Sequence, residues 1–236
     1  MTPVSLFLLA FLCAREMDAT ELNDTILTKI IKDFRHVRPE EKEQFSFLIA
    51  LKPSECRQGG KQMYLNGNIS SEQPQISGNS DDFKPKLNYI ALHPDGAEDC
   101  SEFKIIFNMR DGKRLPLWFA DQVKKARILI NGGCVLLYTE NTPCTRKCFS
   151  GKNFIDIVGP LKDLPFLDWK APKINKYFVY GEVDNCDKNK KARIIQRFQC
   201  LDEGGIDPNG TFLFRRCKEN LPCDQCNRQN DYCVNN

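Results

Sequence analysis

The chain lacks a strong excess of charge of either sign, a second hydrophobic run of transmembrane length, and an internal repeat. Its 34 basic and 31 acidic side chains give a formal net charge of +3. The net charge alone therefore does not predict strong electrostatic binding of polyanions. Histidine is also scarce, with two residues in 236. We therefore expect a globular protein rather than a repeat array or a multispan membrane protein.

The length and composition fit one full hydrophobic core with a small appendage. Thr2 to Ala14 form an uncharged apolar run that is too short to span a bilayer, and Arg15 follows it. We interpret residues 1–14 as a secretory signal peptide, the alternative being a buried or interfacial segment. A main domain over 15–216 and a cysteine-rich tail over 217–236 are then expected.

Three acceptor triplets for N-glycosylation begin at Asn23, Asn68 and Asn209. They agree with passage through the secretory pathway and indicate a secreted, extracellular glycoprotein.

Hydrophobic periodicity and turn residues divide the chain into alternating strands and helices. We expect helices over 20–34, from Asp99 or Asp95 to about 109, over 117–127, from Pro143 onward, and over 190–198. We expect strands over 44–51, 87–92, 135–138, 176–183 and 211–215, with a weak hairpin strand over 62–65 inside a long surface loop. This alternation predicts an α/β protein built as a three-layer sandwich.

Two cysteine motifs each stand where a helix is expected to begin. The first is Cys100-Ser101-Glu102, and the second is Pro143-Cys144-Thr145-Arg146-Lys147-Cys148. Thr142 can cap the second helix, and Cys144 and Cys148 are four residues apart, which places both on one helical face. A helix N-terminus favours negative charge and lowers the pKa of a thiol, so these cysteines suit metal ligation as thiolates.

Three thiolates on zinc leave one coordination position for water, whose pKa can fall toward about 7 in open catalytic sites. Cys100, Cys144 and Cys148 are the predicted zinc ligands. Because an all-thiolate site acidifies water less strongly, a nearby proton acceptor matters more, and Glu102 is placed to serve as the catalytic acid and base.

Structural alternatives exist for each of these residues. Glu102 stands three residues after Asp99 and can instead complete a capping-box-like turn. The motif cysteines can instead form disulfides, as expected in a secreted protein. His93 is an alternative ligand, and a second zinc module can be drawn from the four tail cysteines Cys217, Cys223, Cys226 and Cys233.

These motifs resemble those of the zinc-dependent cytidine deaminase superfamily, whose signature pairs a His or Cys, any residue and Glu with a downstream Pro-Cys-x-x-Cys. The run from Val135 to Cys144 looks like that family's central strand and its turn into the second zinc motif, and it is similar to the AID/APOBEC-like branch. The second motif here has three residues between its cysteines instead of two.

The resemblance implies a mixed five-stranded sheet flanked by helices, one zinc per chain, and hydrolytic conversion of cytosine to uracil in a nucleoside or a single-stranded nucleic acid. Cysteine as the first ligand resembles deaminases of free nucleosides. The alternative from another class is an inactive, disulfide-stabilised extracellular binding protein that keeps the deaminase-like fold.

Cysteine parity agrees with a metal site. If Cys13 leaves with the signal peptide, eleven cysteines remain, and assigning three of them to zinc leaves an even number for disulfides. We expect four disulfides among the eight others, which are Cys56, Cys134, Cys186, Cys200, Cys217, Cys223, Cys226 and Cys233.

Basic and aromatic residues give two further expectations about the substrate. A basic set can follow a phosphate backbone if its members share one face, although a solvated helix face is the simpler interpretation: Lys188, Lys190, Lys191, Arg193, Arg197, Arg215, Arg216 and Lys218. Aromatic side chains that can stack on a base, or else belong to the core, are Trp118, Phe119, Tyr138 and Phe149, and Trp169 can lie in an exposed loop.

Overall fold

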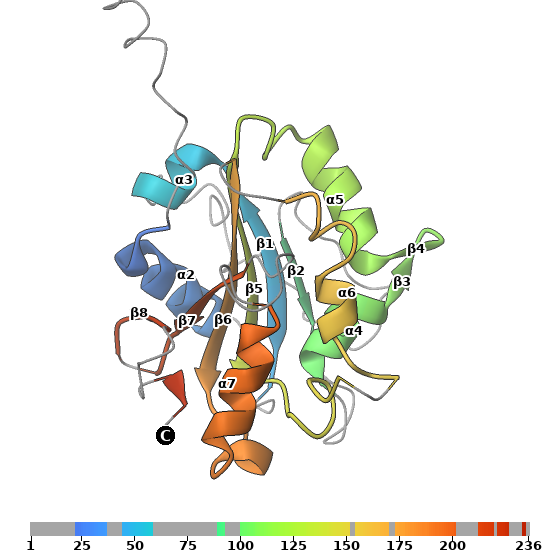
Figure 1. The fold of residues 1–236 in the computed structure, drawn as a ribbon. Coiled ribbons are helices and arrows are strands. Elements are labelled where there is room, and N and C mark those ends of the chain that lie inside the picture. The colour runs from blue at the N-terminus through green and yellow to red at the C-terminus, as the bar shows by residue number, and fades with distance from the viewer. Residues whose placement is uncertain are drawn as a thin grey trace, which may run out of the picture.

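The computed structural model shows an α/β protein with one main mixed sheet and helices around it (Figure 1). The structure describes residues 22–36, 44–58, 89–92, 100–151, 154–169, 173–201, 212–219, 221–226 and 233–234. The predicted signal peptide, the predicted hairpin strand over 62–65, His93, and the acceptor residues Asn68 and Asn209 lie outside these ranges.

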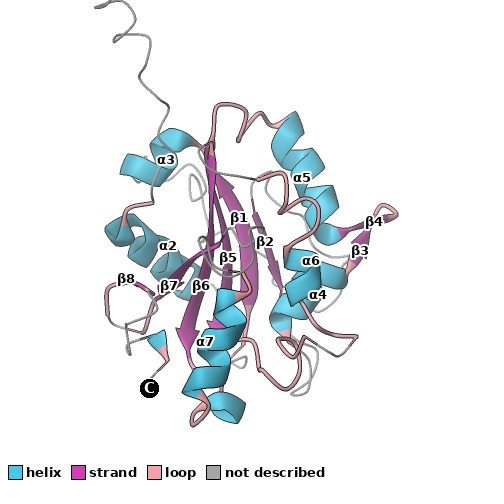
Figure 2. Ribbon diagram, viewed as in Figure 1, coloured by secondary structure: helices cyan, strands magenta, loops and turns pink. Residues whose placement is uncertain are grey.

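The main sheet has six strands in the order β2-β1-β5-β6-β7-β8 (Figure 2). Their bounds are β1 Ser46–Leu51, β2 Tyr89–Leu92, β5 Gly133–Asn141, β6 Ile174–Glu182, β7 Phe212–Arg216 and β8 Asp224–Gln225, and a separate hairpin pairs β3 Met109–Arg110 with β4 Lys113–Arg114. β5 runs parallel to β6 and β6 parallel to β7, whereas β1 is antiparallel to both of its neighbours. The α/β class and the mixed sheet are therefore confirmed.

The helices are α2 Asp24–His36, α3 Pro53–Gln58, α4 Ser101–Phe107, α5 Leu115–Lys125, α6 Val158–Leu161 and α7 Lys191–Gln199, with a short 3-10 helix η1 at Asn185–Asp187. The expected helices over 20–34, 117–127 and 190–198 are confirmed within a few residues as α2, α5 and α7. The helix expected from the Asp95 to Asp99 region begins at Ser101 and ends at Phe107.

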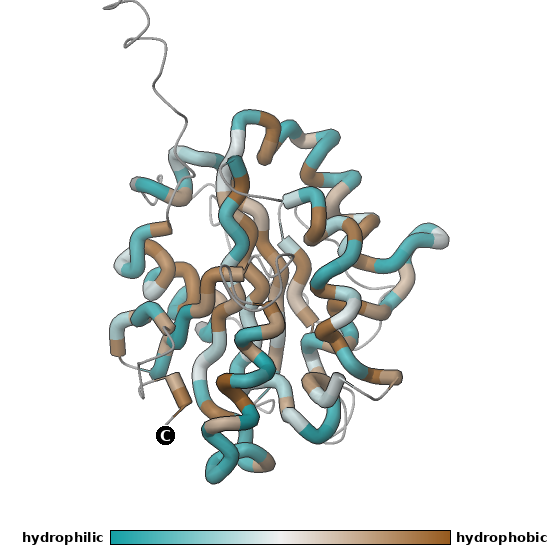
Figure 3. Tube along the Cα trace, in the orientation of Figure 1, coloured by the Kyte–Doolittle hydropathy of each residue, from teal (hydrophilic) through white to brown (hydrophobic). Residues whose placement is uncertain are grey.

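The sheet is apolar on both faces, because alternate residues of each strand enter two separate hydrophobic cores. In β1, Leu48 and Ala50 belong to the core that packs against α4, α5 and α7. Phe47 and Ile49 face the opposite way, into the core that packs against α2. Figure 3 shows the resulting pattern, with hydrophobic strands at the centre of the molecule and hydrophilic segments concentrated around its outside.

The helix expected from Pro143 onward is wrong. Residues 145–149 form a series of turns, in which the backbone N–H groups of Lys147 and Phe149 both donate to the carbonyl of Cys144. Longer-range contacts replace helical capping at this point, because the buried carboxylate of Asp187 accepts the backbone N–H of Thr145 at 2.6 Å. Local propensity is therefore overridden by tertiary contacts.

The cysteine-rich tail contributes β8, whose Gln225 and Asp224 pair with Arg215 and Arg216 of β7. This addition explains why the sheet has six strands instead of the predicted five.

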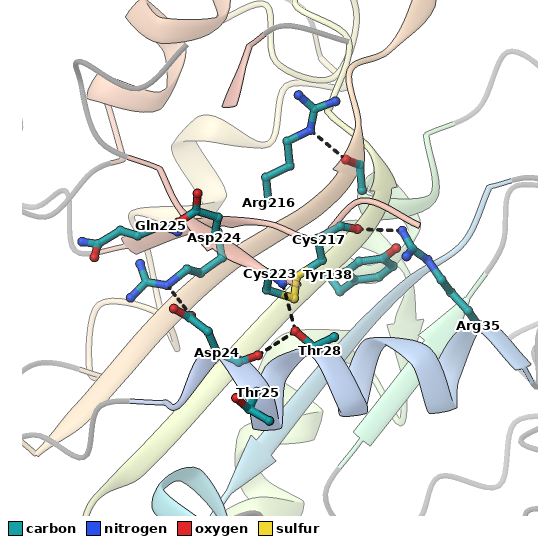
Figure 4. Close-up of a disulfide and its surroundings, with 12 residues drawn as sticks. Asp24, Thr25, Thr28, Arg35, Tyr138, Arg216, Cys217, Cys223, Asp224 and Gln225 are labelled. Carbon is teal, nitrogen blue, oxygen red and sulfur yellow. Dashed lines mark hydrogen bonds and ion pairs between the residues drawn. A yellow bond between two sulfur atoms is a disulfide. The ribbon is translucent and has the colours of Figure 1, made fainter. Parts of the chain in front are cut away.

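The tail also contacts α2 (Figure 4). The backbone N–H of Cys223 donates to Thr28 Oγ1 at 2.9 Å, and Arg35 donates to the carbonyl of Cys217 at 2.9 Å.

Three disulfides drawn from the expected set of eight cysteines are present, namely Cys56–Cys134, Cys217–Cys223 and Cys226–Cys233. Cys217–Cys223 and Cys226–Cys233 confirm that the four tail cysteines form disulfides. These four cysteines therefore have no free thiolate with which to bind a second zinc in this state.

Within the part of the chain that the structure describes, no helix combines the length and the hydrophobicity needed to cross a membrane.

Candidate functional site

The candidate site lies where the carboxyl ends of β5 and β6 meet. Because these strands are parallel, residues that follow them emerge at the same edge of the sheet. Asn141 ends β5, and the backbone N–H of Thr142 donates to the carbonyl of Glu182 at the end of β6. A pocket of about 260 Å³ opens here, lined by Gln44, Cys100, Glu102, Thr139, Asn141, Thr142, Cys144, Lys147, Asp184, Asn185 and Cys186.

Two of the three predicted zinc ligands and the predicted catalytic glutamate thus share one pocket, although their motifs are more than 40 residues apart in sequence. The third predicted ligand, Cys148, is fully buried and does not line the pocket, but it is bonded to Cys100, which does.

Glu102 is buried, with 4% of its surface exposed, and occupies the first turn of α4. Its Oε2 accepts from Ser101 Oγ at 3.2 Å and from Thr139 Oγ1 at 3.3 Å. Burial raises the pKa of Glu102 to about 7, and the nearby charge of Asp184 adds to the rise, while the hydrogen bonds from its own backbone, Ser101 and Thr139 partly oppose it. The side chain is thus fixed by β5 as well as by its own helix turn.

Cys100 occupies the N-cap position of α4 in an extended backbone conformation and makes no side-chain capping hydrogen bond. The following Ser101 is tied to β1, because its Oγ lies 2.6 Å from Ser46 Oγ. Ser46 is paired with Thr139 across the β1–β5 ladder. The Ser46–Ser101 contact therefore places the start of α4 next to Thr139, where Glu102 accepts its hydroxyl. Asp99, one of the two residues expected to cap this helix, lies outside the described residues.

The second motif is held in place by the segment that follows β6. Asp187 Oδ1 accepts the Thr145 hydroxyl at 2.6 Å, and the backbone N–H of Asp184 donates to Thr142 Oγ1 at 3.0 Å. Both Asp187 and Thr145 are completely buried. The position of Cys144 therefore depends on η1 more than on the local sequence of the motif.

All three motif cysteines are paired in disulfides. One disulfide joins two motif cysteines, and the other joins a motif cysteine to a cysteine outside the two motifs. Cys100 is bonded to Cys148, and Cys144 is bonded to Cys186 of η1. The expectation of four disulfides within the set of eight is therefore wrong at two positions, since Cys186 pairs with a motif cysteine and Cys200 is the unpaired cysteine among the described residues. The alternative in which the motif cysteines form disulfides describes this state of the protein.

Among the residues that the structure describes, two groups of side chains have donor atoms close enough to hold a metal ion. Cys100, Glu102 and Cys148 form one group, and Cys144, Cys186 and Asp187 form the other, with all donor atoms within 4.8 Å of one another in each group. The three predicted ligands are consequently divided between two neighbouring groups in the disulfide state.

The aromatic residues considered for base stacking belong to the core instead. Trp118, Phe119, Tyr138 and Phe149 are all buried, and none of them lines the pocket. Trp169, whose exposure the sequence left open, is also buried, with its ring packed edge-on against Phe119 and Phe166.

The basic set does not form one face. Arg215 and Arg216 are buried and paired with Asp24 and Glu182, respectively, and Arg197 donates to the carbonyl of Ser150. Lys190 donates to the Cys186 carbonyl and pairs with Asp187, whereas Lys188 and Arg193 are exposed.

Four residues around the site were not assigned to it from the sequence. Thr139 contacts Glu102, and Asp184, Cys186 and Asp187 follow β6 and meet the second motif. The signal for the last three was their place shortly after the strand predicted over 176–183, because the loops that follow parallel neighbouring strands lie at one edge of a sheet. No sequence pattern singled out Thr139, which lies inside β5.

A mixed α/β sheet with a buried glutamate and paired cysteine motifs at one sheet edge defines a cytidine-deaminase-like protein. A family model agrees with this class: Secreted Novel AID/APOBEC-like Deaminase 1, or SNAD1, matches residues 24–236. The chain therefore belongs to the SNAD1 family of AID/APOBEC-like deaminases, a family described as secreted, and its localisation is extracellular. Comparison with curated proteins gives no match.

Zinc fits this site in one redox form only. Cysteine binds zinc as a thiolate, and the sulfurs of Cys100, Cys144 and Cys148 are engaged in disulfides in the state described above. The Cys100 and Cys148 sulfurs and the Glu102 carboxylate lie within 4.8 Å of one another, and Cys144 lines the pocket that Cys100 and Glu102 also line. The donor chemistry of the dithiol form therefore fits zinc.

Proposed function

We propose that the chain is a zinc-dependent hydrolytic deaminase that acts on cytosine in a nucleoside or a single-stranded nucleic acid. The observation that carries the proposal is the buried Glu102 beside two cysteine motifs in one pocket, in a chain of the AID/APOBEC-like deaminase class. We retain the division into a signal peptide over 1–14, a deaminase-like domain over 15–216 and a cysteine-rich tail over 217–236.

Cys100, Cys144 and Cys148 would hold the zinc as thiolates when reduced. When bound, zinc acts as a Lewis acid that lowers the pKa of water and so supplies a nucleophile near neutral pH. Glu102 takes the proton of the attacking water at its carboxylate. It delivers that proton to the ring nitrogen as hydroxide adds at the carbon bearing the amino group. It then carries the proton of the added hydroxyl to the amino group, so that the C–N bond breaks, ammonia leaves and the carbonyl of uracil forms.

The environment of Glu102 suits both halves of this proton transfer. A group that must accept and then donate a proton works best when its pKa lies near the working pH. Burial raises the pKa of Glu102 to about 7, and Thr139 Oγ1 and Ser101 Oγ both contact Oε2, which fixes the direction of the carboxylate.

The polar side chains on the pocket wall favour recognition of a base by hydrogen bonds. Gln44, Asn141 and Asn185 carry amides, which both donate and accept, as the edge of a cytosine requires. Lys147 lies on the same wall and supplies a positive charge suited to a phosphate group of the substrate.

The test is a deamination assay on the zinc-loaded, reduced protein. Cytidine, deoxycytidine and cytosine-containing single-stranded DNA and RNA are incubated with the protein, and uracil formation is followed by mass spectrometry. We expect Glu102→Gln to lower kcat by about 10²- to 10⁴-fold while zinc is retained. The matched control is Glu219→Gln, which changes an exposed glutamate outside the pocket and leaves kcat unchanged.

The disulfides favour a second candidate function, an inactive extracellular binding protein with the deaminase-like fold. With Cys100–Cys148 and Cys144–Cys186 intact, the chain has no thiolate at either motif. This candidate predicts no uracil from any of these substrates, in wild type or variant, together with a zinc content near zero under reducing conditions that preserve the fold.

A further inference from the structure

The three cysteines proposed as zinc ligands share one property that the remaining disulfides lack. Each belongs to a disulfide that has at least one member on the pocket wall, namely Cys100–Cys148 or Cys144–Cys186. Cys56–Cys134, by contrast, is completely buried in the core between α3 and β5. The site therefore contains four sulfurs that can be two disulfides or four thiols.

We propose that this cluster is a thiol–disulfide switch for the metal site, with Cys186 as the residue that withdraws Cys144 from the ligand set. The proposal rests on the ligand set of the proposed function. In the oxidised form, both disulfides are closed and zinc is not bound. In the reduced form, Cys100, Cys144 and Cys148 bind zinc as thiolates, and Cys186 stays a free thiol.

The exchange is balanced by a dithiol reductant. Each disulfide takes up two electrons and two protons from one dithiol, which closes into a cyclic disulfide. The two disulfides therefore consume two dithiols and yield four thiols. Three of these thiols release their protons when zinc binds, and reoxidation reverses the sequence and expels the ion.

The pocket gives a reductant and a metal ion the same entrance. Cys100, Cys144 and Cys186 all line the pocket, and Cys186 is only half-buried. A thiolate can therefore attack the Cys144–Cys186 bond at Cys186, because exchange rates depend on access to the sulfur that is attacked.

The loops around the cluster are held by hydrogen bonds that do not depend on the disulfides. On η1, the backbone N–H of Cys186 donates to Asp184 Oδ1 at 2.7 Å, and Lys190 donates to the Cys186 carbonyl. On the second motif, the backbone N–H of Ile157 donates to the Cys148 carbonyl at 2.8 Å. Opening the disulfides thus leaves the backbone positions of these cysteines supported.

The extracellular localisation sets the resting state of the switch. Disulfides form and persist in oxidising compartments, so the secreted chain is expected to leave the cell with both disulfides closed. Zinc loading then requires contact with a dithiol, and the pocket becomes competent only where such a reductant is present.

The test is an equilibrium titration of the secreted full chain in dithiothreitol buffers of varied reduced-to-oxidised ratio, with free zinc held constant by a chelator. Bound zinc per chain is measured after gel filtration, and differential alkylation with mass spectrometry identifies each free, protected or paired cysteine. We expect zinc to rise from zero to one per chain as both pocket disulfides open. Zinc is expected to protect Cys100, Cys144 and Cys148 from alkylation while Cys186 is labelled.

The Cys186→Ser variant gives the sharpest result. It leaves one pocket disulfide to be opened, so the slope of log bound zinc against the log of the dithiol-to-disulfide ratio should fall from two to one at low occupancy. The matched control is the double variant Cys217→Ser, Cys223→Ser, which removes a tail disulfide and should keep the slope of two. Far-UV circular dichroism establishes that each variant is folded.

Three results would overturn the switch: zinc bound while both pocket disulfides persist, no zinc in a folded chain with both open, or loss of zinc from folded Cys186→Ser. Its failure is distinguishable from failure of the proposed function. One zinc per chain in the reduced form, without uracil from any substrate, would contradict the proposed deaminase activity and support the switch. Uracil production by the disulfide form would support the deaminase activity and contradict the switch.

Discussion

At the scale of single residues, the protonation of Glu102 couples the pocket to stability. In the metal-free chain, burial raises the pKa of Glu102 from 4.5 to about 7, so the folded state keeps a proton that the unfolded state has already lost. The stabilisation from this proton is fully present below pH 4.5 and is lost as the pH rises through 7. We expect wild type to lose about 3 kcal/mol relative to Glu102→Gln across this window, because one pKa unit corresponds to about 1.4 kcal/mol.

Urea denaturation of both proteins at a series of pH values measures this difference. Parallel curves of unfolding free energy against pH, for wild type and Glu102→Gln, would show that Glu102 titrates normally and would contradict its burial.

A second residue-scale prediction concerns Thr139, whose hydroxyl lies 3.3 Å from Glu102 Oε2 and 2.9 Å from the carbonyl of Asn141. Thr139→Val keeps the shape but removes the hydroxyl, so Glu102 loses a partner that fixes its direction. We expect kcat to fall about tenfold with KM little changed. Thr139→Ser should recover most of the rate, and equal losses in both variants would assign Thr139 a packing role only.

At the scale of elements, η1 is the support of the second motif. Asp187 accepts both the backbone N–H and the hydroxyl of Thr145, and both residues are completely buried. Asp187→Ala leaves these donors without a partner, which should lower the free energy of unfolding by about 2 to 4 kcal/mol. Asp121→Ala removes an exposed partner of Lys113 and should cost less than about 1 kcal/mol. Similar losses in the two variants, by urea denaturation, would contradict the supporting role of η1.

Elements with strong periodicity were predictable from the sequence, and the second motif was not. Ile26, Ile30 and Phe34 mark one face of α2, and the apolar run from Val135 to Tyr138 marks β5. The turns after Pro143 depend on Asp187, which lies more than 40 residues away in sequence. Periodicity carries no information on such a contact, so capping and helix propensity alone gave the wrong local structure there.

The site could be predicted in its residue types but not in its bonding. Glu102, Cys100 and Cys144 were identified from spacing, and they do line one pocket. The partner of Cys144 could not be deduced, because disulfide connectivity depends on which loops follow adjacent parallel strands. Thr139 lies inside β5 opposite Ser46 of β1, and its contact with Glu102 depends on where α4 begins relative to the sheet, which the sequence alone does not give.

At the scale of the whole molecule, the disulfides outside the pocket close chain segments of very different length, and two of them mark the extremes. Cys56–Cys134 closes a separation of 78 residues, whereas Cys217–Cys223 closes a separation of 6. Loop entropy therefore predicts that the double serine variant at Cys56 and Cys134 loses about 4 kcal/mol and the tail variant about 2 kcal/mol. Thermal and urea unfolding without reductant measures both losses. A larger loss for the tail variant would mean that β8 and its contact with α2 dominate over the core disulfide.

The central claim, that Cys100, Cys144 and Cys148 form a zinc centre next to Glu102, is tested most directly by the zinc-to-protein ratio of the folded, reduced chain. The comparison variants are Cys144→Ser, which removes a proposed ligand, and Cys200→Ser, which removes the cysteine at the C-cap of α7, unpaired in the described part of the chain. We predict one zinc per chain in wild type and Cys200→Ser, and none in Cys144→Ser. A folded, reduced wild type without zinc, or zinc retained by Cys144→Ser, would contradict the account.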